Sequence, residues 1–309
     1  MTPTDNADKP YALIEAGGTK FVLGIARDKD RILATHRVPT TTPAETLAAV
    51  EAWFTAQAAI YGGYRALGIA SFGPVQLNRD ATDWGHITAT TKPHWSNTNV
   101  APRLAAALEC EAVGWDTDVN GAALAESLWG AAQGCRSALY FTIGTGIGGG
   151  AIINGQILRG QSHSEMGHIR LARHADDRVA DGTPFPGICP FHGDCLEGLA
   201  SGPAIIARYG QSLSHLPPDH PGHDIIAYYL GQMVANMQSI FEPDRIILGG
   251  GVMGTPGLLP RIISAAEHLG SAYFSSTAAD IVTLPGLGDQ AGLLGALALA
   301  QAAECHDIR

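Results

Sequence analysis

Short apolar runs alternate along the chain with stretches of helical periodicity, and this pattern predicts strands and helices in turn. The apolar run over residues 11–25 is interrupted by Gly17-Gly18, which is typical of a β-hairpin with a glycine-rich corner. Leu47, Val50, Phe54 and Ala58 recur at a spacing close to 3.6 residues and predict a helix over 43–59. The other elements expected in this half are strands at 32–38, 66–71 and 112–115, and a helix at 99–109 with Asn99 as its N-cap.

The second half of the chain repeats this scheme. Residues 138–153 again read as strand, glycine corner and strand, and they lead to a third short strand at 156–158. The elements expected after it are a helix at 224–241, a buried strand at 245–248 that runs into Gly249, and a helix at 291–303. Alternating strands and helices with a duplicated hairpin predict an α/β protein of two domains.

The pattern also sets the expected domain boundaries. We expect a disordered lead over 1–10, because it is polar and has no apolar segment of the kind found in signal peptides. A small N-terminal α/β domain is expected over 11–117, joined by the C-terminal helix 290–304. A larger α/β domain is expected over 118–289.

Composition and charge narrow the class of protein. The 309 residues carry a formal net charge of −10 and no block of Lys or Arg, so nucleic acid and anionic membranes are poor partners. No apolar run reaches the roughly 18 residues of a membrane span. The five cysteines form no disulfide framework of a secreted protein, so we expect a cytoplasmic protein.

Three glycine-rich corners follow predicted strands and are candidates for binding phosphate. Backbone N–H groups at such corners can point at phosphate oxygens. Taken singly, each corner is typical of a plain tight turn, and neither a P-loop nor a dinucleotide-binding fingerprint is present. The repeat of two corners in two domains favours phosphate. The residues concerned are Gly17, Gly18, Thr19, Lys20, Gly144, Thr145, Gly146, Gly249 and Gly250.

A second kind of chemistry lies in the loop 187–198, which is rich in Gly and Pro. Cys189, His192 and Cys195 form a C-x2-H-x2-C pattern, whose sulfur and nitrogen ligands suit tetrahedral Zn²⁺. A fourth ligand is missing locally.

Asp118 stands where a predicted buried strand ends and a predicted helix begins. A carboxylate placed there can accept the proton of a substrate hydroxyl, or it can simply cap the helix. The residues alone leave these two roles open.

Several of these stretches together resemble the ROK family of sugar kinases, within the actin-like ATPase superfamily. EAGGTK at 15–20 and TIGTGIGGG at 142–150 resemble the two phosphate loops of the family, and LGGGVM at 248–253 resembles its adenosine loop. The resemblance extends to GLGDQAGLLGALALA at the C-terminal end. It implies a two-domain actin-like ATPase (ribonuclease H-like) fold with an interdomain cleft, ATP and Mg²⁺ as cofactors, and a homodimer. Glu15 replaces the Asp of many members, as in fructokinase-like members, and its role in holding Mg²⁺ stays open.

The resemblance also implies roles for single residues. DVNGAALAE at 118–126 matches the catalytic segment of the family and makes Asp118 the general base. Glu165 and His168 match the family's sugar-binding E-x-G-H motif, in which the His is also a zinc ligand. Other implied sugar contacts are Gly73, Asn97 and Glu197. Trp95 packs against the sugar or belongs to the core, and His163 is a weaker candidate for the pocket.

The expected function is transfer of the ATP γ-phosphoryl group to a hexose, with D-fructose giving D-fructose 6-phosphate as the first choice. Resemblance of EAGGTK, KPHWSN and CPFHGDC to fructokinase-like members favours fructose. The alternatives are glucose, mannose or an N-acetylhexosamine as acceptor. A remote alternative is a non-catalytic sugar-sensing regulator, which the ten residues before Tyr11 and the charge of −10 make a poor fit.

Overall fold

The computed structural model describes residues 8–179, 181–270 and 273–305, and these form two compact units. Unit 1 comprises the described residues within Met1–Leu128, Ile157–His163 and Leu287–Arg309. Unit 2 comprises those within Trp129–Gln156 and Ser164–Gly286. Most of the expected disordered lead, residues 1–7, lies outside the described residues.

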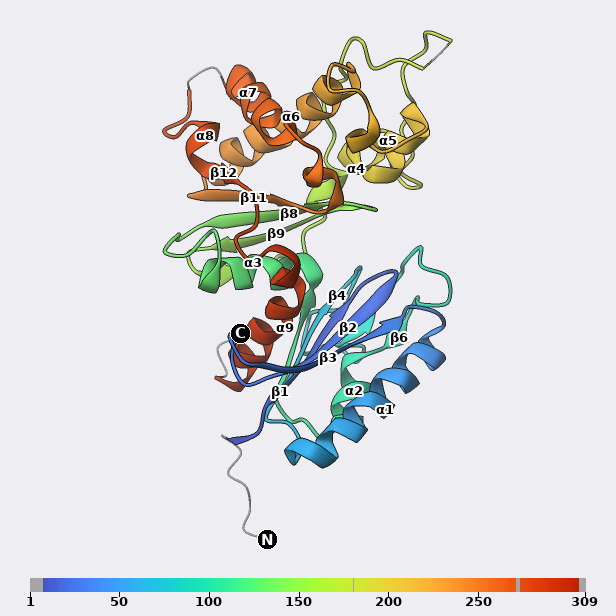
Figure 1. Ribbon diagram of the computed structural model, residues 1–309, viewed down its shortest axis with the longest axis vertical. Coiled ribbons are helices and arrows are strands. Elements are labelled where there is room, and N and C mark those ends of the chain that lie inside the picture. Colours follow the sequence, from blue (N-terminus) through green and yellow to red (C-terminus); the bar gives the residue numbers. More distant parts are fainter. Residues whose placement is uncertain (1–7, 180, 271–272, 306–309) are drawn as a thin grey trace. The chain divides into compact units, whose positions relative to one another are not determined.

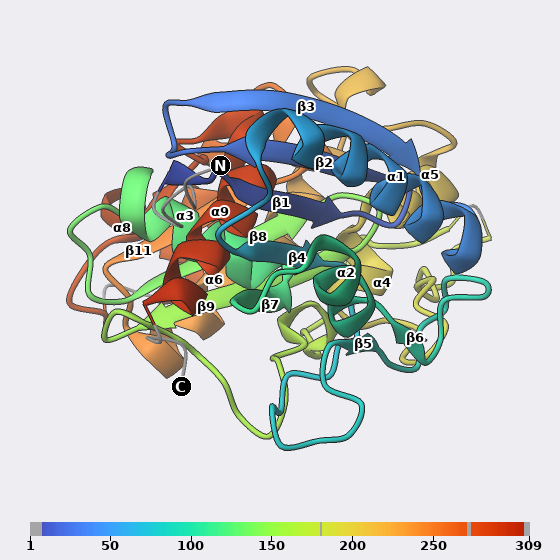
Figure 2. The same cartoon turned by 90° about the horizontal axis from the view of Figure 1, so that it is seen from below.

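Unit 1 is built on a five-stranded sheet in the order β3-β2-β1-β4-β7 (Figures 1 and 2). β1, β2 and β3 are antiparallel, whereas β4 and β7 continue the sheet parallel to β1. The predicted glycine-cornered hairpin and the third strand after it are thereby confirmed. The strands are β1 (Tyr11–Ala16), β2 (Lys20–Ala26), β3 (Ile32–Pro39), β4 (Leu67–Ser71) and β7 (Val113–Thr117), and a separate pair is formed by β5 (His86–Ile87) and β6 (Thr98–Asn99).

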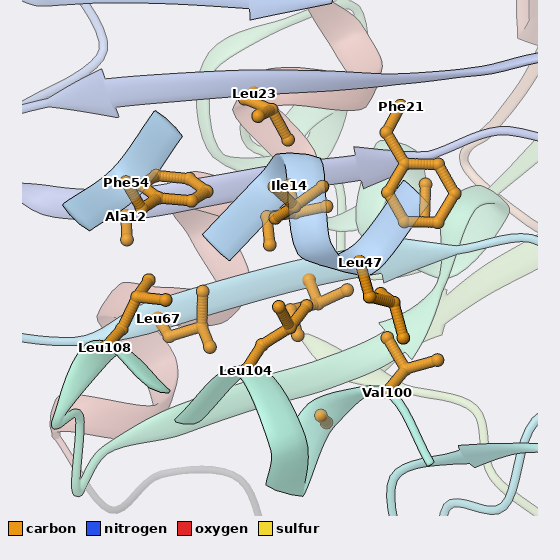
Figure 3. Close-up of a cluster of buried hydrophobic side chains, with 14 of the residues drawn as sticks. Ala12, Ile14, Phe21, Leu23, Leu47, Phe54, Leu67, Val100, Leu104 and Leu108 are labelled. Carbon is orange, nitrogen blue, oxygen red and sulfur yellow. The ribbon is translucent and has the colours of Figure 1, made fainter. Parts of the chain in front are cut away.

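Two helices cover one face of this sheet and enclose the core of unit 1. Figure 3 shows alternate side chains of β1 and β2, such as Ile14 and Leu23, directed toward the side chains of α1 (Pro43–Tyr61) and α2 (Ala101–Leu108). The period of two in the strands and of about 3.6 in the helices places these apolar positions on facing surfaces. A capping box between Thr42 and Glu45 begins α1.

The start of α2 differs from the expectation. Its N-cap is Val100, which makes no side-chain capping bond, and not Asn99. The Asn99 carboxamide oxygen instead accepts the backbone N–H of Arg103 at 3.3 Å. Asn99 therefore contacts the first turn from one position further out, because Thr98 and Asn99 are held in the short strand β6.

Helix α9 (Ala291–Glu304) lies against the opposite face of the sheet, and two glycines make this approach possible. A Cβ at Gly68 of β4 would lie 1.8 Å from the carbonyl oxygen of Ala296, and one at Gly114 of β7 would lie 2.1 Å from that of Leu299. Gly68 and Gly114 are direct partners in the sheet register. Their missing side chains leave room for the close approach of this Ala- and Leu-rich helix, in which the charged residue Glu304 comes last.

Helix α3 (Asp118–Trp129) also belongs almost entirely to unit 1, which shifts the expected boundary after residue 117 to a position after Leu128. The helix crosses α9 closely: a Cβ at Gly295 would lie 2.6 Å from the carbonyl carbon of Gly121. The backbone N–H of Leu287 also donates to a Glu126 carboxylate oxygen at 3.0 Å. These contacts join α3 to the C-terminal segment, and so to unit 1.

Unit 2 repeats the plan of unit 1. Its sheet has the order β10-β9-β8-β11-β12, in which the antiparallel hairpin β8–β9 is continued by β11 parallel to β8 (Figure 1). The strands are β8 (Ala138–Ile143), β9 (Ile147–Ile153), β10 (Gln156–Ile157), β11 (Arg245–Gly249) and β12 (Val282–Thr283). The helices are α4 (Leu196–Ala200), α5 (Gly202–Tyr209), α6 (Gly222–Phe241), α7 (Leu258–Gly270) and α8 (Ala278–Ile281), with 3-10 turns η2 (Met166–His168), η3 (Leu213–His215) and η4 (Gly251–Gly254), and η5 (Gly288–Gln290) in unit 1. The internal repeat and the α/β class are thereby confirmed. Among the described residues, no helix is both long and apolar enough to cross a membrane.

Candidate functional site

The first glycine corner, Gly17–Lys20, joins β1 to β2 and is exposed from Gly18 onward. The backbone N–H of Gly17 donates to the carbonyl of Lys20 at 3.0 Å, and a Cβ at Gly17 would lie 2.8 Å from that oxygen. The Thr40 hydroxyl donates to the Gly17 carbonyl at 2.7 Å and secures the corner from outside. This tight, exposed turn suits the close approach of an anion.

A polar cavity of about 790 Å³ lies beside this corner in unit 1. Burial raises the pKa of Glu15, against the attraction of Lys20 and Arg37. A Cβ at Gly292 would lie only 2.2 Å from the carboxyl carbon of Glu15, so the glycine leaves room for this carboxyl group. The cavity therefore combines the half-buried Glu15 and the exposed Asp289 with two cations, Lys20 and Arg37. Its lining is Glu15, Lys20, Val22, Ile32, Thr35, His36, Arg37, Asp289, Gln290 and Leu293.

The second and third glycine corners lie on one pocket of about 430 Å³ in unit 2. Gly250 has φ +89°, and a Cβ there would lie 2.4 Å from the carbonyl oxygen of Ile143, just before the second corner. The backbone N–H of Gly202 donates to the carbonyl of Gly144 at 2.8 Å. Glycine at these positions thus allows three segments to meet. The pocket is lined by Gly144, Thr145, Gly202, Pro203, Ile205, Ile206, Ser212, Leu213, Ser214, Gly251, Val252 and Thr255.

The chemistry of this pocket suits a nucleoside phosphate. Ile205, Ile206, Leu213 and Val252 offer apolar contacts, as flat aromatic ligands require. The N-terminus of α5 lies at the same pocket through Gly202 and Pro203, and helix N-termini favour anions. Sequence reasoning missed this wall, although Ser201-Gly202-Pro203 before an apolar stretch is a signal for the start of a helix.

Asp118 is the first residue of α3, directly after β7, and is half-buried. Its carboxylate accepts the backbone N–H of Val119 at 2.9 Å. The capping role belongs to Thr117, whose hydroxyl accepts the N–H of Asn120 at 3.1 Å. Thr117 therefore caps the helix in place of Asp118. The carboxylate of Asp118 is oriented by the first turn of the helix.

Glu165 directly precedes the 3-10 turn η2 in unit 2, and His168 is the last residue of this turn. The glycine between them is required, because a Cβ at Gly167 would lie 1.7 Å from the carbonyl oxygen of Ile147 in β9. Glu165 is exposed, and its Oε2 lies 3.9 Å from Nε2 of His168. One hydroxyl oxygen can bridge two groups at this separation by hydrogen bonds of ordinary length.

The structure brings His168 together with the three residues of the C-x2-H-x2-C pattern. One ligand atom each of His168, Cys189, His192 and Cys195 lies within 4.8 Å of all the others. The loop that carries the C-x2-H-x2-C pattern is closed by two reciprocal backbone hydrogen bonds between Cys189 and Gly193, at 2.9 and 3.1 Å. The N–H of Leu196 donates to the carbonyl of Ile169 at 3.0 Å, and so aligns the chain after His168 with the chain after Cys195.

The distances within this cluster fit a tetrahedral metal ion. Nδ1 of His168 lies 3.4 Å from Sγ of Cys195 and 3.7 Å from Sγ of Cys189, which itself lies 3.6 Å from Nδ1 of His192. Zinc bonds of about 2.3 Å to sulfur and about 2.0 Å to nitrogen place such atoms about 3.6 Å apart in a tetrahedron. Burial, with the neighbouring Cys189, raises the pKa of the Cys195 thiol to about 11. A divalent cation would oppose this shift, since thiolates are its ligands.

Glu197 connects the cluster to the second glycine corner. It follows Cys195 in α4, and its Oε2 accepts the backbone N–H of Ile147 at 2.9 Å. A Cβ at Gly146 would lie 2.7 Å from the same oxygen. Movement of the cysteine loop would therefore be transmitted to the corner.

In unit 1, the residues expected around the sugar lie in two loops. Gly73 precedes Pro74, and His163 lies beside this loop, where its Nε2 accepts the backbone N–H of Val75 at 3.1 Å. Asn97 is exposed and has φ +57°. For Trp95 the core alternative is correct: the side chain is 0% exposed, packs against Phe21 and donates from Nε1 to the Thr41 carbonyl at 2.8 Å.

Comparison with curated proteins reveals relatives along nearly the whole chain. A fructokinase from Zymomonas mobilis is 46% identical over 303 residues, which cover 97% of this chain and 99% of the relative. A fructokinase from Pediococcus pentosaceus is 40% identical, with 94% and 97% covered. A glucokinase from Streptomyces coelicolor is 28% identical, with 93% and 96% covered.

Solved structures share the fold. A ROK hexokinase from Thermus thermophilus superposes with a TM-score of 0.76 at 28% identity, covering 96% of this chain and 99% of the other. A ROK family glucokinase from Streptomyces griseus, in complex with glucose and AMPPNP, gives 0.72 at 25% identity, with 94% and 99% covered. The model of the ROK family matches residues 11–303. The predicted resemblance and the actin-like ATPase fold are thus confirmed, and the chain belongs to the ROK family.

Proposed function

We propose that this protein is an ATP-dependent sugar kinase that phosphorylates D-fructose to D-fructose 6-phosphate. The observation that carries the proposal is the carboxylate of Asp118, held by the first turn of α3 within a ROK family chain. Fructose is favoured over glucose because the fructokinase relatives are 40% and 46% identical and the glucokinase is 28% identical.

Asp118 is proposed as the general base. Attack on the γ-phosphorus of ATP requires a carboxylate that accepts the proton of the sugar hydroxyl as the oxygen–phosphorus bond forms. The bond between the γ-phosphorus and the bridging oxygen then breaks, and ADP leaves. The Val119 N–H occupies one side of the carboxylate and fixes its rotation.

The sugar ligands are proposed as the family resemblance implies them. Glu165 and His168 in unit 2 are suited to a shared hydroxyl, because Nδ1 of His168 faces the cysteines and leaves Nε2 directed toward Glu165. Gly73, Asn97 and Glu197 are proposed as further contacts. His163 is added because it lies against the Gly73 loop.

A structural Zn²⁺ is proposed at His168, Cys189, His192 and Cys195. The distances between the donor atoms and the Cys/His chemistry fit the ion. When bound, zinc would neutralise two thiolates and fix the ring of His168. The residues themselves do the binding: His168 presents Nε2 toward the sugar, and Glu197 carries the rigidity of the loop to Ile147.

The nucleotide is proposed to bind its phosphates at the glycine corners and its base in the 430 Å³ pocket. Mg²⁺ would reduce the negative charge of the phosphates. Glu15 is proposed to contribute to holding it, because it is the half-buried carboxylate beside the first corner. Lys20 would add a positive charge at the same corner.

Ile206→Glu tests the base pocket. Ile206 lines it and is 50% exposed, so a carboxylate is tolerated there while it repels the nucleotide and removes an apolar contact. We expect KM for ATP to rise about 10-fold, with KM for fructose unchanged, in initial-rate measurements. The matched control is Ile240→Glu on α6, at a residue 65% exposed and outside this pocket, which should leave both constants unchanged. Equal KM for ATP in both variants would refute the assignment.

The acceptor is tested with a panel of hexoses in a coupled assay of ADP release. We expect fructose to give the largest kcat/KM, and glucose, mannose and N-acetylhexosamines to follow. Turnover of glucose without turnover of fructose would contradict the proposed acceptor and leave a kinase of another specificity. No turnover with any hexose, while sugar still binds, would support the sugar-sensing alternative.

A homodimer follows from the resemblance, and a cytoplasmic location follows from the pattern of cysteines. Both stay predictions, as does the absence of nucleic acid and membrane partners. The net charge of −10 supports the last of these. Sugar and ATP are the proposed partners.

A further inference from the structure

Asp116, two residues before the proposed base, is an acidic side chain in the interior of unit 1. It is 0% exposed and lies in β7, the strand that ends at Thr117. Removing a carboxylate from water is costly unless other groups supply charge and hydrogen bonds. A carboxylate in this place therefore requires hydrogen-bond donors or a cation beside it.

Four hydrogen bonds surround this carboxylate. Oδ1 accepts the backbone N–H of Thr117 at 2.8 Å and the side-chain amide of Asn120 at 2.7 Å. Oδ2 accepts Nη2 of Arg159 at 2.6 Å and Nε of the same guanidinium at 3.2 Å. One oxygen thus holds the start of α3, and the other is held by the arginine.

Arg159 reaches Asp116 from a distant part of the chain. The chain leaves unit 2 at Ile157, runs through unit 1 as far as His163 and returns to unit 2 at Ser164. Within this excursion, Arg159 binds Asp116 and His163 binds the backbone of Val75. The segment is therefore attached to unit 1 at two points, and one of them is the turn that carries Asp118.

Resting on the proposed function of Asp118, we propose that Arg159 is a positioning residue of the kinase reaction. It anchors Asp116, and through Asp116 it fixes the turn from β7 into α3 that presents the base. Asp118 lies between Thr117 and Asn120, and both of these bond to Oδ1 of Asp116. Rotation of Asp116 would therefore move the backbone on both sides of Asp118. Misplacement of a catalytic group by about 1 Å can lower the rate about 100-fold.

The test compares Arg159→Met and Arg159→Lys with the wild-type enzyme, in kcat and KM at a temperature where thermal unfolding shows each protein to be folded. Arg159→Met should lower kcat about 100-fold and leave KM for ATP within about 2-fold. Arg159→Lys keeps the charge but cannot make the two hydrogen bonds of the guanidinium group, so its kcat should lie between those of Arg159→Met and the wild type. A purely structural role would lower the unfolding temperature and leave kcat of the folded protein intact, and that result would overturn the proposal.

The matched control is Arg103→Met. Arg103 also binds a carboxylate through Nε and Nη2, that of Glu51, at 2.6 and 3.2 Å, between α2 and α1 of the same unit. Since this pair has no contact with the turn that carries Asp118, kcat should stay at the wild-type value. A loss of kcat equal to that of Arg159→Met would overturn the positioning role.

A double variant covers the case in which Arg159→Met does not fold. Asp116→Asn combined with Arg159→Met removes both charges together, and the new amide keeps an oxygen acceptor for Thr117 and Asn120. We expect this protein to fold and to have kcat lowered at least about 10-fold; wild-type kcat would overturn the proposal. Failure of the proposed function itself would be recognised by a different result, namely that the wild-type enzyme turns over no hexose. If it turns over a hexose other than fructose, that sugar serves the same comparison.

Discussion

Asp118→Asn should lower kcat about 1,000-fold, within the range of about 100- to 10,000-fold that general-base catalysis contributes. The substitution keeps the size of the side chain and an oxygen that can accept the Val119 N–H, so the first turn of α3 should be preserved. What is lost is the ability to take the proton from the sugar hydroxyl. Because binding does not require proton transfer, KM for ATP and for fructose should change little. Initial rates with saturating sugar and nucleotide, and equilibrium binding of each, measure both parts.

Asp224→Asn serves as the matched control for this experiment. Asp224 is also an acid in the first turn of a helix, α6, and it pairs with Arg261 at the surface. Its loss should leave kcat unchanged. A kcat of Asp118→Asn within about 10-fold of the wild type would show that Asp118 is not the base.

The elements that the sequence predicted best are those with strong local signals. Alternating apolar residues around Gly17-Gly18 and Gly144–Gly146 predicted both hairpins, because a tight corner needs glycine and the sheet faces need apolar side chains. The C-x2-H-x2-C loop predicted the cysteine cluster for the same local reason, and the fourth residue, His168, came from the family resemblance.

The parts that could not be predicted depend on contacts between distant positions. The place of α3 in unit 1 depends on Gly121 meeting Gly295, 174 positions further along the chain (295 minus 121). The ion pair between Arg159 and Asp116 joins residues 43 positions apart, and no spacing rule predicts such a pair from the sequence. Trp95 was open between two roles because only the fold shows that the Thr41 carbonyl meets its indole N–H.

Burial separates two acids that look alike in the sequence. Asp116 and Asp118 lie on either side of Thr117 in the sequence. Asp116 is fully buried and pairs with Arg159, whereas Asp118 is half-buried at the start of α3. Asp116 lies inside β7, whereas Asp118 is the first residue of α3, where the chain has left the strand. One carboxylate is therefore paired with Arg159 inside the unit, and the other is partly exposed at the start of the helix.

Loss of the two cysteines of the cluster, in Cys189→Ser/Cys195→Ser, should remove about one Zn²⁺ per chain, measured by metal analysis of the purified protein. An ion present at about 1,000 times its Kd stabilises the folded state by about 4 kcal/mol. At about 2–4 °C per kcal/mol, the unfolding temperature should fall by about 10 °C. The kcat/KM for fructose should fall about 10- to 100-fold, because the ring of His168 loses its support beside Glu165.

The matched control is Cys135→Ser, since Cys135 is half-buried and stands outside the cluster. It should keep its zinc content, unfolding temperature and kcat/KM. KM for ATP should also stay constant in the double variant, because the pocket assigned to the base includes none of the four cluster residues. A double variant that retains about one Zn²⁺ per chain would contradict the site. If the double variant loses the metal and keeps the wild-type unfolding temperature, the ion binds at these residues but does not stabilise the loop. In that case the proposed sugar ligands His168 and Glu197 must be oriented only by the hydrogen bonds that the backbone N–H groups of Leu196 and Ile147 donate.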